Sequence, residues 1–200
     1  MDVSESGWLE KGYINMEMIE NPVRIWTIGH STRTSEEFIA LLESHEIRVV
    51  ADVRQFPGSR RHPQFGRQRL SLALEAAGLL YTHLPELGGR RATRPDSPNT
   101  AWRNAAFHGY ADYMMTESFR LGIERLVGLA RQQKTAMMCA EALWWRCHSA
   151  LIADNLKAHG HKVFHILSAD KVQAHPYTSA ARIIGGKLSD CEEQDLLSTA

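Results

Sequence analysis

Cysteine is scarce in this chain, and long apolar runs are missing. Only three cysteines occur among the 200 residues. They are too few and too unevenly spaced for a disulfide framework, so we expect a protein of the reducing cytoplasm. No apolar run approaches the roughly 20 residues of a membrane span, and the N-terminal residues lack the basic start and apolar block of a secretion signal. We therefore expect neither a disulfide-stabilised scaffold nor a membrane partner.

The two common nucleotide-binding signatures are also missing. The chain contains no G-x-G-x-x-G sequence, which marks dinucleotide-binding turns, and no G-x-x-x-x-G-K-[ST] sequence, which marks phosphate-binding loops. The sequence therefore assigns no cofactor.

Lysine is absent from the middle of the chain, whereas arginine is abundant there. Nine arginines lie between Arg54 and Arg103, opposed only by Glu75, Glu86 and Asp96, although the net charge of the whole chain is +0. The planar guanidinium group presents paired donors that suit phosphate or carboxylate. Two interpretations stay open for this block: an anion-binding surface, or a solvated surface without a ligand.

The patterns that are present predict an α/β fold. Apolar runs typical of strands cover residues 23–30, 47–53, 79–84, 135–140 and 161–167, and helical patterns cover residues 34–46, 67–78, 105–133 and 143–160. This alternation predicts a single three-layer domain with a mainly parallel sheet of about five strands and helices on both faces. We expect the domain at residues 22–170, an acidic N-terminal extension at 1–21 and a C-terminal tail at 171–200.

Ionisable and polar side chains follow four of the five expected strands. They are His30 and Ser31, Asp52 and Arg54, His83 and Glu86, and Cys139 and Glu141. Ligands of parallel sheets bind beyond the carboxyl ends of the strands. The sequence therefore predicts a functional site at this edge, shared by His30 and Cys139.

Six ordered motifs between about Arg24 and about Ser168 resemble one known family. They read TIGHS, ADVRQFPGSRR, YTHLPELGG, FHGYADYM, MMCAEALWWRCH and IADNLKAHGHKVFHI. The series closely resembles the family called domain of unknown function 488. The resemblance implies a single α/β domain, supplies no reaction, and implies roles for His30, Asp52, Arg54, Glu86, Cys139, Glu141, Cys147 and His148.

The chain departs from this family at one position. The family commonly has Cys-His-Arg where this chain has Cys147, His148 and Ser149. If that arginine helps to hold a ligand, its role is absent here or passes to Arg146.

Cys139 is our candidate nucleophile. We expect it between a strand and a helix, where free N–H groups and the helix dipole lower a thiol pKa. His30 or His148 would serve as the base, and Glu141 would orient it. The alternative is that Cys139 is a small buried core residue. A phosphatase-like loop is excluded, because six residues rather than five separate Cys139 from Arg146.

Cys147 is expected within a helix, packed and unreactive. A metal site is an open alternative, with Cys139, Cys147, His148 and His30 as ligands, although no short Cys-x-x-Cys pair is present.

The combined hypothesis is a cysteine- and histidine-dependent hydrolase or transferase acting on an anionic, phosphate-bearing substrate such as a nucleotide or a nucleic-acid end. The expected substrate-binding residues are Ser31, Asp52, Arg54, Arg60, Arg61, His83, Glu86 and Arg146. Two other classes stay open. One is a non-catalytic module that binds nucleic acid or another anion, and the other is a metal-binding or redox protein using Cys139, Cys147 and His148.

Overall fold

The structure is a computed structural model of the chain. It describes residues 21–58, 60–97, 99, 101–102, 104–184 and 187–189. Residues 1–20 of the expected N-terminal extension and residues 190–200 of the expected tail, including Cys191, lie outside the described residues.

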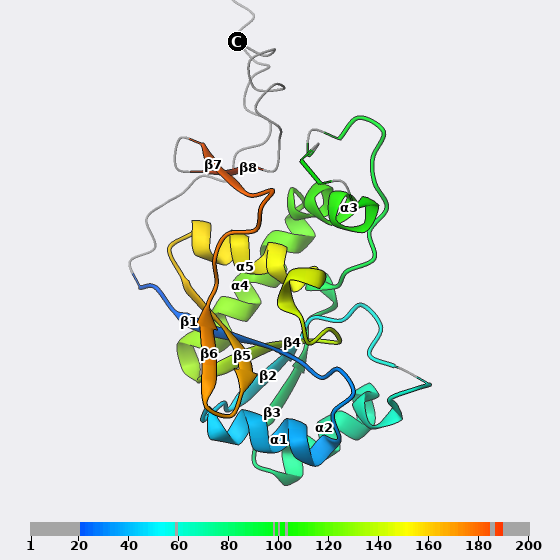
Figure 1. The fold of residues 1–200 in the computed structure, drawn as a ribbon, viewed down its shortest axis with the longest axis vertical. Helices are drawn as coiled ribbons and strands as arrows, with labels where there is room; N and C mark the ends of the chain where they lie inside the picture. The colour runs from blue at the N-terminus through cyan, green and yellow to red at the C-terminus, as the bar shows by residue number, and fades with distance from the viewer. Residues whose placement is uncertain are drawn as a thin grey trace, which may run out of the picture.

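Six strands form one sheet in the order β3-β2-β4-β1-β5-β6 (Figure 1). Their bounds are Arg24–Gly29 for β1, Val49–Asp52 for β2, Leu80–His83 for β3, Thr135–Cys139 for β4, Lys162–Ser168 for β5 and Lys171–Ala174 for β6. The first five strands are parallel, and β6 is antiparallel to β5. The structure confirms the mainly parallel sheet and extends it by β6, in a segment that was expected to be tail.

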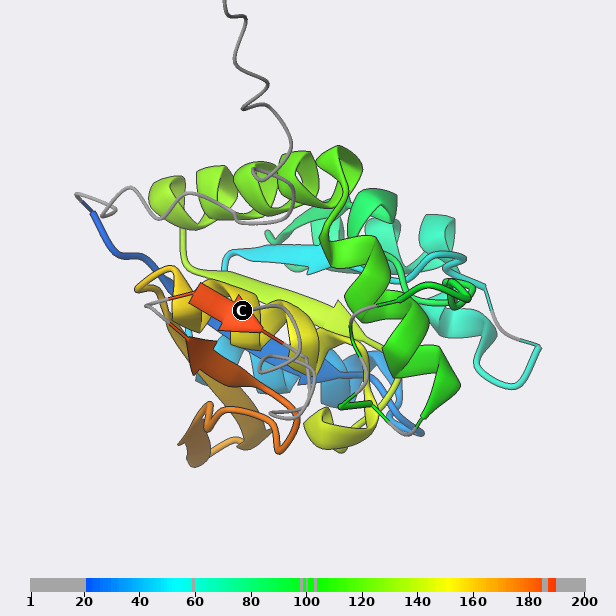
Figure 2. The same cartoon turned by 90° about the horizontal axis from the view of Figure 1, so that it is seen from above.

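Helices cover both faces of this sheet, which gives three layers (Figure 1, Figure 2). The helices α1 (Ser35–Ser44) and α2 (Arg67–Ala76) pack on one face. The helices α3 (Ala105–Met114), α4 (Glu117–Gln132) and α5 (Ser149–Ala158) pack on the other. A separate hairpin joins β7 (Arg182–Ile184) to β8 (Lys187–Ser189). No helix in the described part of the chain combines the length and the apolar character needed to cross a membrane.

Local sequence signals explain where several helices begin. Thr34 caps α1: its side chain accepts a hydrogen bond from the Glu37 N–H, and the Glu37 carboxylate accepts one from the Thr34 N–H at 2.8 Å. The helical pattern at 105–133, which the sequence allows to break near Ser118, forms the two helices α3 and α4, because Thr116 caps the second one. Both features satisfy N–H groups that a helix start would otherwise leave unpaired.

The prediction of one helix over residues 143–160 is wrong. A short 3-10 helix, η3 (Trp144–Arg146), comes first, and α5 begins only at Ser149. Between them Cys147 has an extended backbone (φ −119°, ψ 144°), which ends the helical path. Neither proline nor glycine marks this break in the sequence.

The connections between strands change from one face of the sheet to the other at β4. The crossovers after β1 and β2 use α1 and α2, whereas those after β3 and β4 use the helices of the opposite face. Because β4 lies between β2 and β1, the loop after β4 and the loops after its two neighbours leave toward different faces. Such switch points form the crevices in which open α/β sheets bind ligands, and Cys139 is the last residue of β4.

Candidate functional site

His30 and Cys139 are adjacent at this edge, but their side chains lie on opposite faces of the sheet. The His30 N–H donates to the Cys139 carbonyl at 3.0 Å. Gly29 is the register partner of Cys139, and successive residues of a strand point to opposite faces. The His30 ring therefore stacks on Phe65 in the core under α1 and α2, whereas Cys139 lies in the core under α3 to α5. The expected pair of Cys139 with His30 as its base is not formed.

Cys139 instead meets Cys147 and His148, which together we call the thiol cluster. The two Sγ atoms are 2.8 Å apart, and both cysteines are free and buried. The His148 Nδ1 atom lies 3.6 Å from the Cys147 Sγ and 3.8 Å from the Cys139 Sγ. The break before α5 makes this possible, because it turns Cys147 away from the helix and toward the end of β4.

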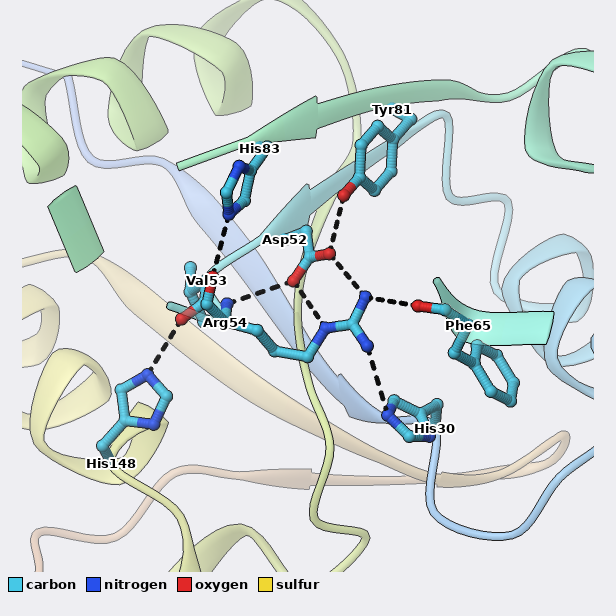
Figure 3. Close-up of polar contacts among 8 residues, drawn as sticks. All are labelled: His30, Asp52, Val53, Arg54, Phe65, Tyr81, His83 and His148. Atoms are coloured by element: carbon cyan, nitrogen blue, oxygen red, sulfur yellow. Dashed lines mark hydrogen bonds and ion pairs between the residues drawn. The ribbon is translucent and has the colours of Figure 1, made fainter. Parts of the chain in front are cut away.

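The surroundings of His148 fix its orientation. Its Nε2–H donates to the Val53 carbonyl at 3.0 Å (Figure 3). The Nδ1 atom therefore faces the two sulfurs. The Tyr110 ring lies edge-on at 5.0 Å between centroids. On another side Gly89 is so close that a Cβ there would lie 2.9 Å from Nδ1. The imidazole is therefore held in one position.

Electrostatics within the thiol cluster favour a thiolate at Cys147. The hydrogen bond between the Cys139 and Cys147 sulfurs is the main reason that the pKa of Cys147 falls well below its ordinary value, with further contributions from His148 and the Ser149 side chain. The same hydrogen bond, together with burial, raises the pKa of Cys139. Burial opposes a charge on His148, but its hydrogen bond to Cys147 and the charge there raise the pKa of the imidazole.

This result reverses the roles expected for the two cysteines. Cys139 does not stand at a helix N-terminus, because residues 140–148 separate it from α5. Its thiol pKa is raised rather than lowered, and Cys147, expected to be packed and unreactive, has the lowered pKa. The expected orienting residue, Glu141, is exposed in the loop after β4.

Ser149 occupies the position at which the resemblance implies an arginine. It is buried at the start of α5, and its side chain hydrogen-bonds Cys147. Arg146 is exposed on η3. The serine at this position thus supports the thiolate directly.

Asp52 and Arg54 form a second buried group on the α1 and α2 face (Figure 3). The Arg54 Nε and Nη2 atoms donate to the two Asp52 carboxylate oxygens at 2.9 and 2.6 Å. Nη2 also donates to the Phe65 carbonyl at 2.9 Å, and Tyr81 donates to Asp52 at 2.7 Å. Arg54 Nη1 lies 3.4 Å from His30 Nε2. These contacts tie the loops after β1 and β2 together, so the pair has a structural role in this arrangement.

His30 is uncharged in this setting. Burial, reinforced by the charge of Arg54, lowers the pKa of its imidazole to about 4. Its Nδ1–H donates to the Ser31 carbonyl at 2.9 Å, which leaves Nε2 as the acceptor toward Arg54. Because the His30 ring faces away from the sulfurs, it cannot serve as their base.

The other expected binding residues divide between loop anchors and exposed groups. The His83 Nε2–H donates to the Arg54 carbonyl at 2.9 Å, and the Glu86 carboxylate pairs with Arg125 of α4. Ser31 has a left-handed backbone (φ 50°), and its N–H donates to the Ala140 carbonyl at 2.8 Å. Arg60 and Arg61 are exposed in the loop after β2.

Sequence reasoning missed a buried chain of polar groups beside the thiol cluster. The His175 Nε2–H donates to the Asp154 carboxylate at 2.9 Å, and His175 Nδ1 accepts from His165 Nε2 at 2.8 Å. His165 Nδ1 then accepts from the Thr27 hydroxyl at 2.6 Å. Trp144 of η3 stacks on the His165 ring at 4.3 Å, and burial lowers the pKa of that imidazole to about 3. No spacing in the sequence signals this chain, because its members come from β1, α5, β5 and the segment after β6.

A small pocket lies beside the polar chain. Thr27 and His165 of the polar chain line it together with Gly29, Trp144 and Ser149. Its volume of about 10 Å³ suits a single water molecule. Ser149, which hydrogen-bonds Cys147, connects the pocket to the thiol cluster.

Comparison with known proteins gives one match. The family model described as Domain of unknown function DUF488 matches residues 34–156, more than half of the chain. This range contains the whole thiol cluster and both Asp52 and Arg54. No curated protein and no solved structure gives a significant match. The chain therefore belongs to the family Domain of unknown function DUF488.

Proposed function

We propose that this protein is a thiol-dependent enzyme, a hydrolase or transferase, in which Cys147 is the nucleophile. The observation that carries the proposal is the buried contact of Cys147 with both the Cys139 thiol and the Nδ1 atom of His148. A thiolate is the reactive form of cysteine, and a neighbouring imidazolium stabilises it. Of the two thiols, Cys147 is the one with the lowered pKa.

The chemistry follows from the protonation states. The Cys147 thiolate forms a bond to an electrophilic phosphorus or carbonyl carbon, the bond to the leaving group breaks, and His148 gives its proton to that group. Attack by water on the resulting sulfur-linked intermediate releases the product, returns one proton to His148 and regenerates the thiolate. Attack by an acceptor alcohol or amine instead makes the reaction a transfer. Cys139 stays protonated and holds the negative charge on Cys147 through its S–H donor.

The substrate proposed is anionic, with a nucleotide or a nucleic-acid end as the first choice. Support comes from the excess of arginine between residues 54 and 103 and from the exposure of Arg60 and Arg61 in the loop after β2. That loop follows the carboxyl end of a strand, at the same edge as Cys139. We place the reaction in the cytoplasm, in line with the scarcity of cysteine.

Alkylation of the two thiols tests the nucleophile. In a Cys191→Ser background, iodoacetamide should label Cys147 with a pH–rate midpoint below the value of about 8.5 of an ordinary thiol. The rate should fall only when the pH drops through that lowered midpoint, since protonation removes the nucleophile. Peptide mass spectrometry follows each cysteine separately. The midpoint matters more than the absolute rate, because both thiols are buried.

Unfolding in urea provides the control, since both cysteines should then titrate as ordinary thiols. His148→Gln should raise the midpoint of Cys147 in the folded protein. A folded protein in which Cys139 has the lower midpoint would reverse the assignment of the nucleophile.

Exchange of Arg60 and Arg61 for glutamine tests the anionic substrate. Binding of a single-stranded oligonucleotide should weaken. The decrease of the logarithm of the association constant with the logarithm of the salt concentration should also become less steep, by about 0.7 for each phosphate group that the protein no longer neutralises. Thermal stability should stay nearly unchanged, because both side chains are exposed. Arg131→Gln is the matched control, since Arg131 is exposed in the last turn of α4, which leads into the opposite end of β4. Equal binding by all variants would leave Arg60 and Arg61 as solvated surface.

A further inference from the structure

We propose that the thiol cluster is a zinc site, with Cys139 Sγ, Cys147 Sγ and His148 Nδ1 as three protein ligands. The inference uses the side chains of the proposed function but rests on ligand geometry, not on reactivity. In the described part of the chain, these three donor atoms lie within 4.8 Å of one another, close enough to bind one metal ion together.

The spacing of nitrogen and sulfur fits tetrahedral zinc. With Zn–S bonds of about 2.3 Å and a Zn–N bond of about 2.0–2.1 Å, the N···S edges of a tetrahedron are roughly 3.5 Å long. The observed separations from His148 Nδ1 are 3.6 and 3.8 Å. The S···S edge of such a site is roughly 3.8 Å, so the sulfurs, now 2.8 Å apart, must separate on binding. Cys147 lies between two helices on extended backbone, where a small rotation can supply this movement.

The hydrogen bond at the other ring nitrogen of His148 is typical of a metal ligand. Histidines that bind metals almost always donate the other ring N–H to a carboxylate or a backbone carbonyl, which fixes the tautomer and aims the lone pair. The Nε2–H of His148 donates to Val53 in this way. Ser149 adds a hydrogen bond to the Cys147 sulfur, and ligand sulfurs are commonly supported by such contacts.

The donor types select the ion. Two thiolates and an imidazole are soft or intermediate ligands that suit Zn²⁺, whereas Mg²⁺ and Ca²⁺ require oxygen donors. Three protein ligands with an open fourth position are typical of catalytic zinc. A bound zinc ion would keep both cysteines as thiolates and would replace the protons on Cys139 and His148, so the thiolate–imidazolium form proposed above belongs to the metal-free protein.

Metal analysis and cobalt substitution test the site. The full chain, purified without chelator, should contain one equivalent of zinc, as measured by elemental mass spectrometry. The zinc-free protein should bind one equivalent of cobalt(II). The bound ion should show the d–d absorption of a tetrahedral site and a sulfur-to-cobalt charge-transfer band. Cys139→Ser and Cys147→Ser should each reduce that band, and His148→Gln should weaken cobalt binding by about 10-fold or more. Cys191→Ser should leave the stoichiometry and both bands unchanged.

A measurement on the unaltered chain protects the test against variants that fail to fold. Zinc should slow the reaction of Cys139 and Cys147 with a disulfide reagent by at least about 10-fold, and a chelator should restore the rate. Reduced, folded wild-type protein that binds neither zinc nor cobalt overturns the zinc site. If Cys147 still shows its lowered midpoint in that protein, the proposed nucleophile stands. In the opposite case, the protein binds metal but Cys147 of the zinc-free protein has the labelling midpoint of an ordinary thiol. The zinc site then stands, and the proposal of a thiolate in the metal-free protein is wrong.

Discussion

Replacement of Asp52 by asparagine should lower the free energy of unfolding by about 3–5 kcal/mol, because it leaves a buried charge without its partner. Asp52 is 0% exposed and Arg54 is 8% exposed, and the two are joined by paired hydrogen bonds. Asparagine preserves the volume but removes the countercharge of the guanidinium and the carboxylate acceptor of the Tyr81 hydroxyl. Thermal unfolding should show a melting temperature lower by roughly 6–20 °C.

The pair of Arg94 and Asp96 is the matched control. It has the same sequence separation and the same paired geometry, with Nε and Nη2 donating to the two carboxylate oxygens at 3.2 and 2.8 Å. Its side chains, however, are 63% and 72% exposed. Exposed pairs contribute little because water and salt screen them, so Asp96→Asn should leave the melting temperature nearly unchanged. Equal effects of the two substitutions would show that burial does not govern the Asp52 pair.

Replacement of Gly29 by alanine should destabilise the protein by more than about 3 kcal/mol, beyond the 1–3 kcal/mol usual for overpacking. A Cβ at this position would lie 1.9 Å from the Glu141 carbonyl oxygen and 2.8 Å from the Ala142 nitrogen. Both atoms belong to the backbone of the loop after β4, so no side chain can rotate to make room. That loop leads from Cys139 to Cys147. The substitution should therefore also raise the labelling midpoint of Cys147 toward that of an ordinary thiol.

Gly128→Ala is the control, and its expected effect on stability has the opposite sign. Gly128 lies within α4, and a Cβ there would meet no atom within 4 Å. Alanine in a helix interior is favoured over glycine by about 0.5–1 kcal/mol, so this variant should be slightly more stable. Chemical denaturation of both variants measures the difference. A Gly29→Ala protein as stable as wild type would mean that the loop after β4 moves freely.

The sequence predicted the fold because its signals are local. Apolar runs at 23–30 and 135–140 mark strands, and the capping pair of Thr34 and Glu37 marks the start of α1. Parallel strands that alternate with helices must bring their carboxyl ends to one edge. Hence the sequence alone placed His30, Asp52 and Cys139 at one end of the sheet, as the structure has them.

The sequence did not reveal which of these residues share a face. His30 directly follows Gly29, the register partner of Cys139, and this offset of one residue sends the His30 and Cys139 side chains to opposite sides of the sheet. The break before α5 has no proline or glycine to announce it, so the approach of Cys147 to Cys139 was only one of the alternatives that the sequence left open.

By itself, then, the sequence determined the α/β class, the order of strands and helices along the chain, and the edge at which polar groups gather, because periodicity and capping act over a few residues. Only the tertiary structure decided that Cys147 and His148 meet Cys139, and that Asp154 reaches His175. These contacts join residues on different elements. Their geometry depends on strand register, on the place where α5 begins and on the packing of a whole face, and none of these is set by the residues nearby in the chain.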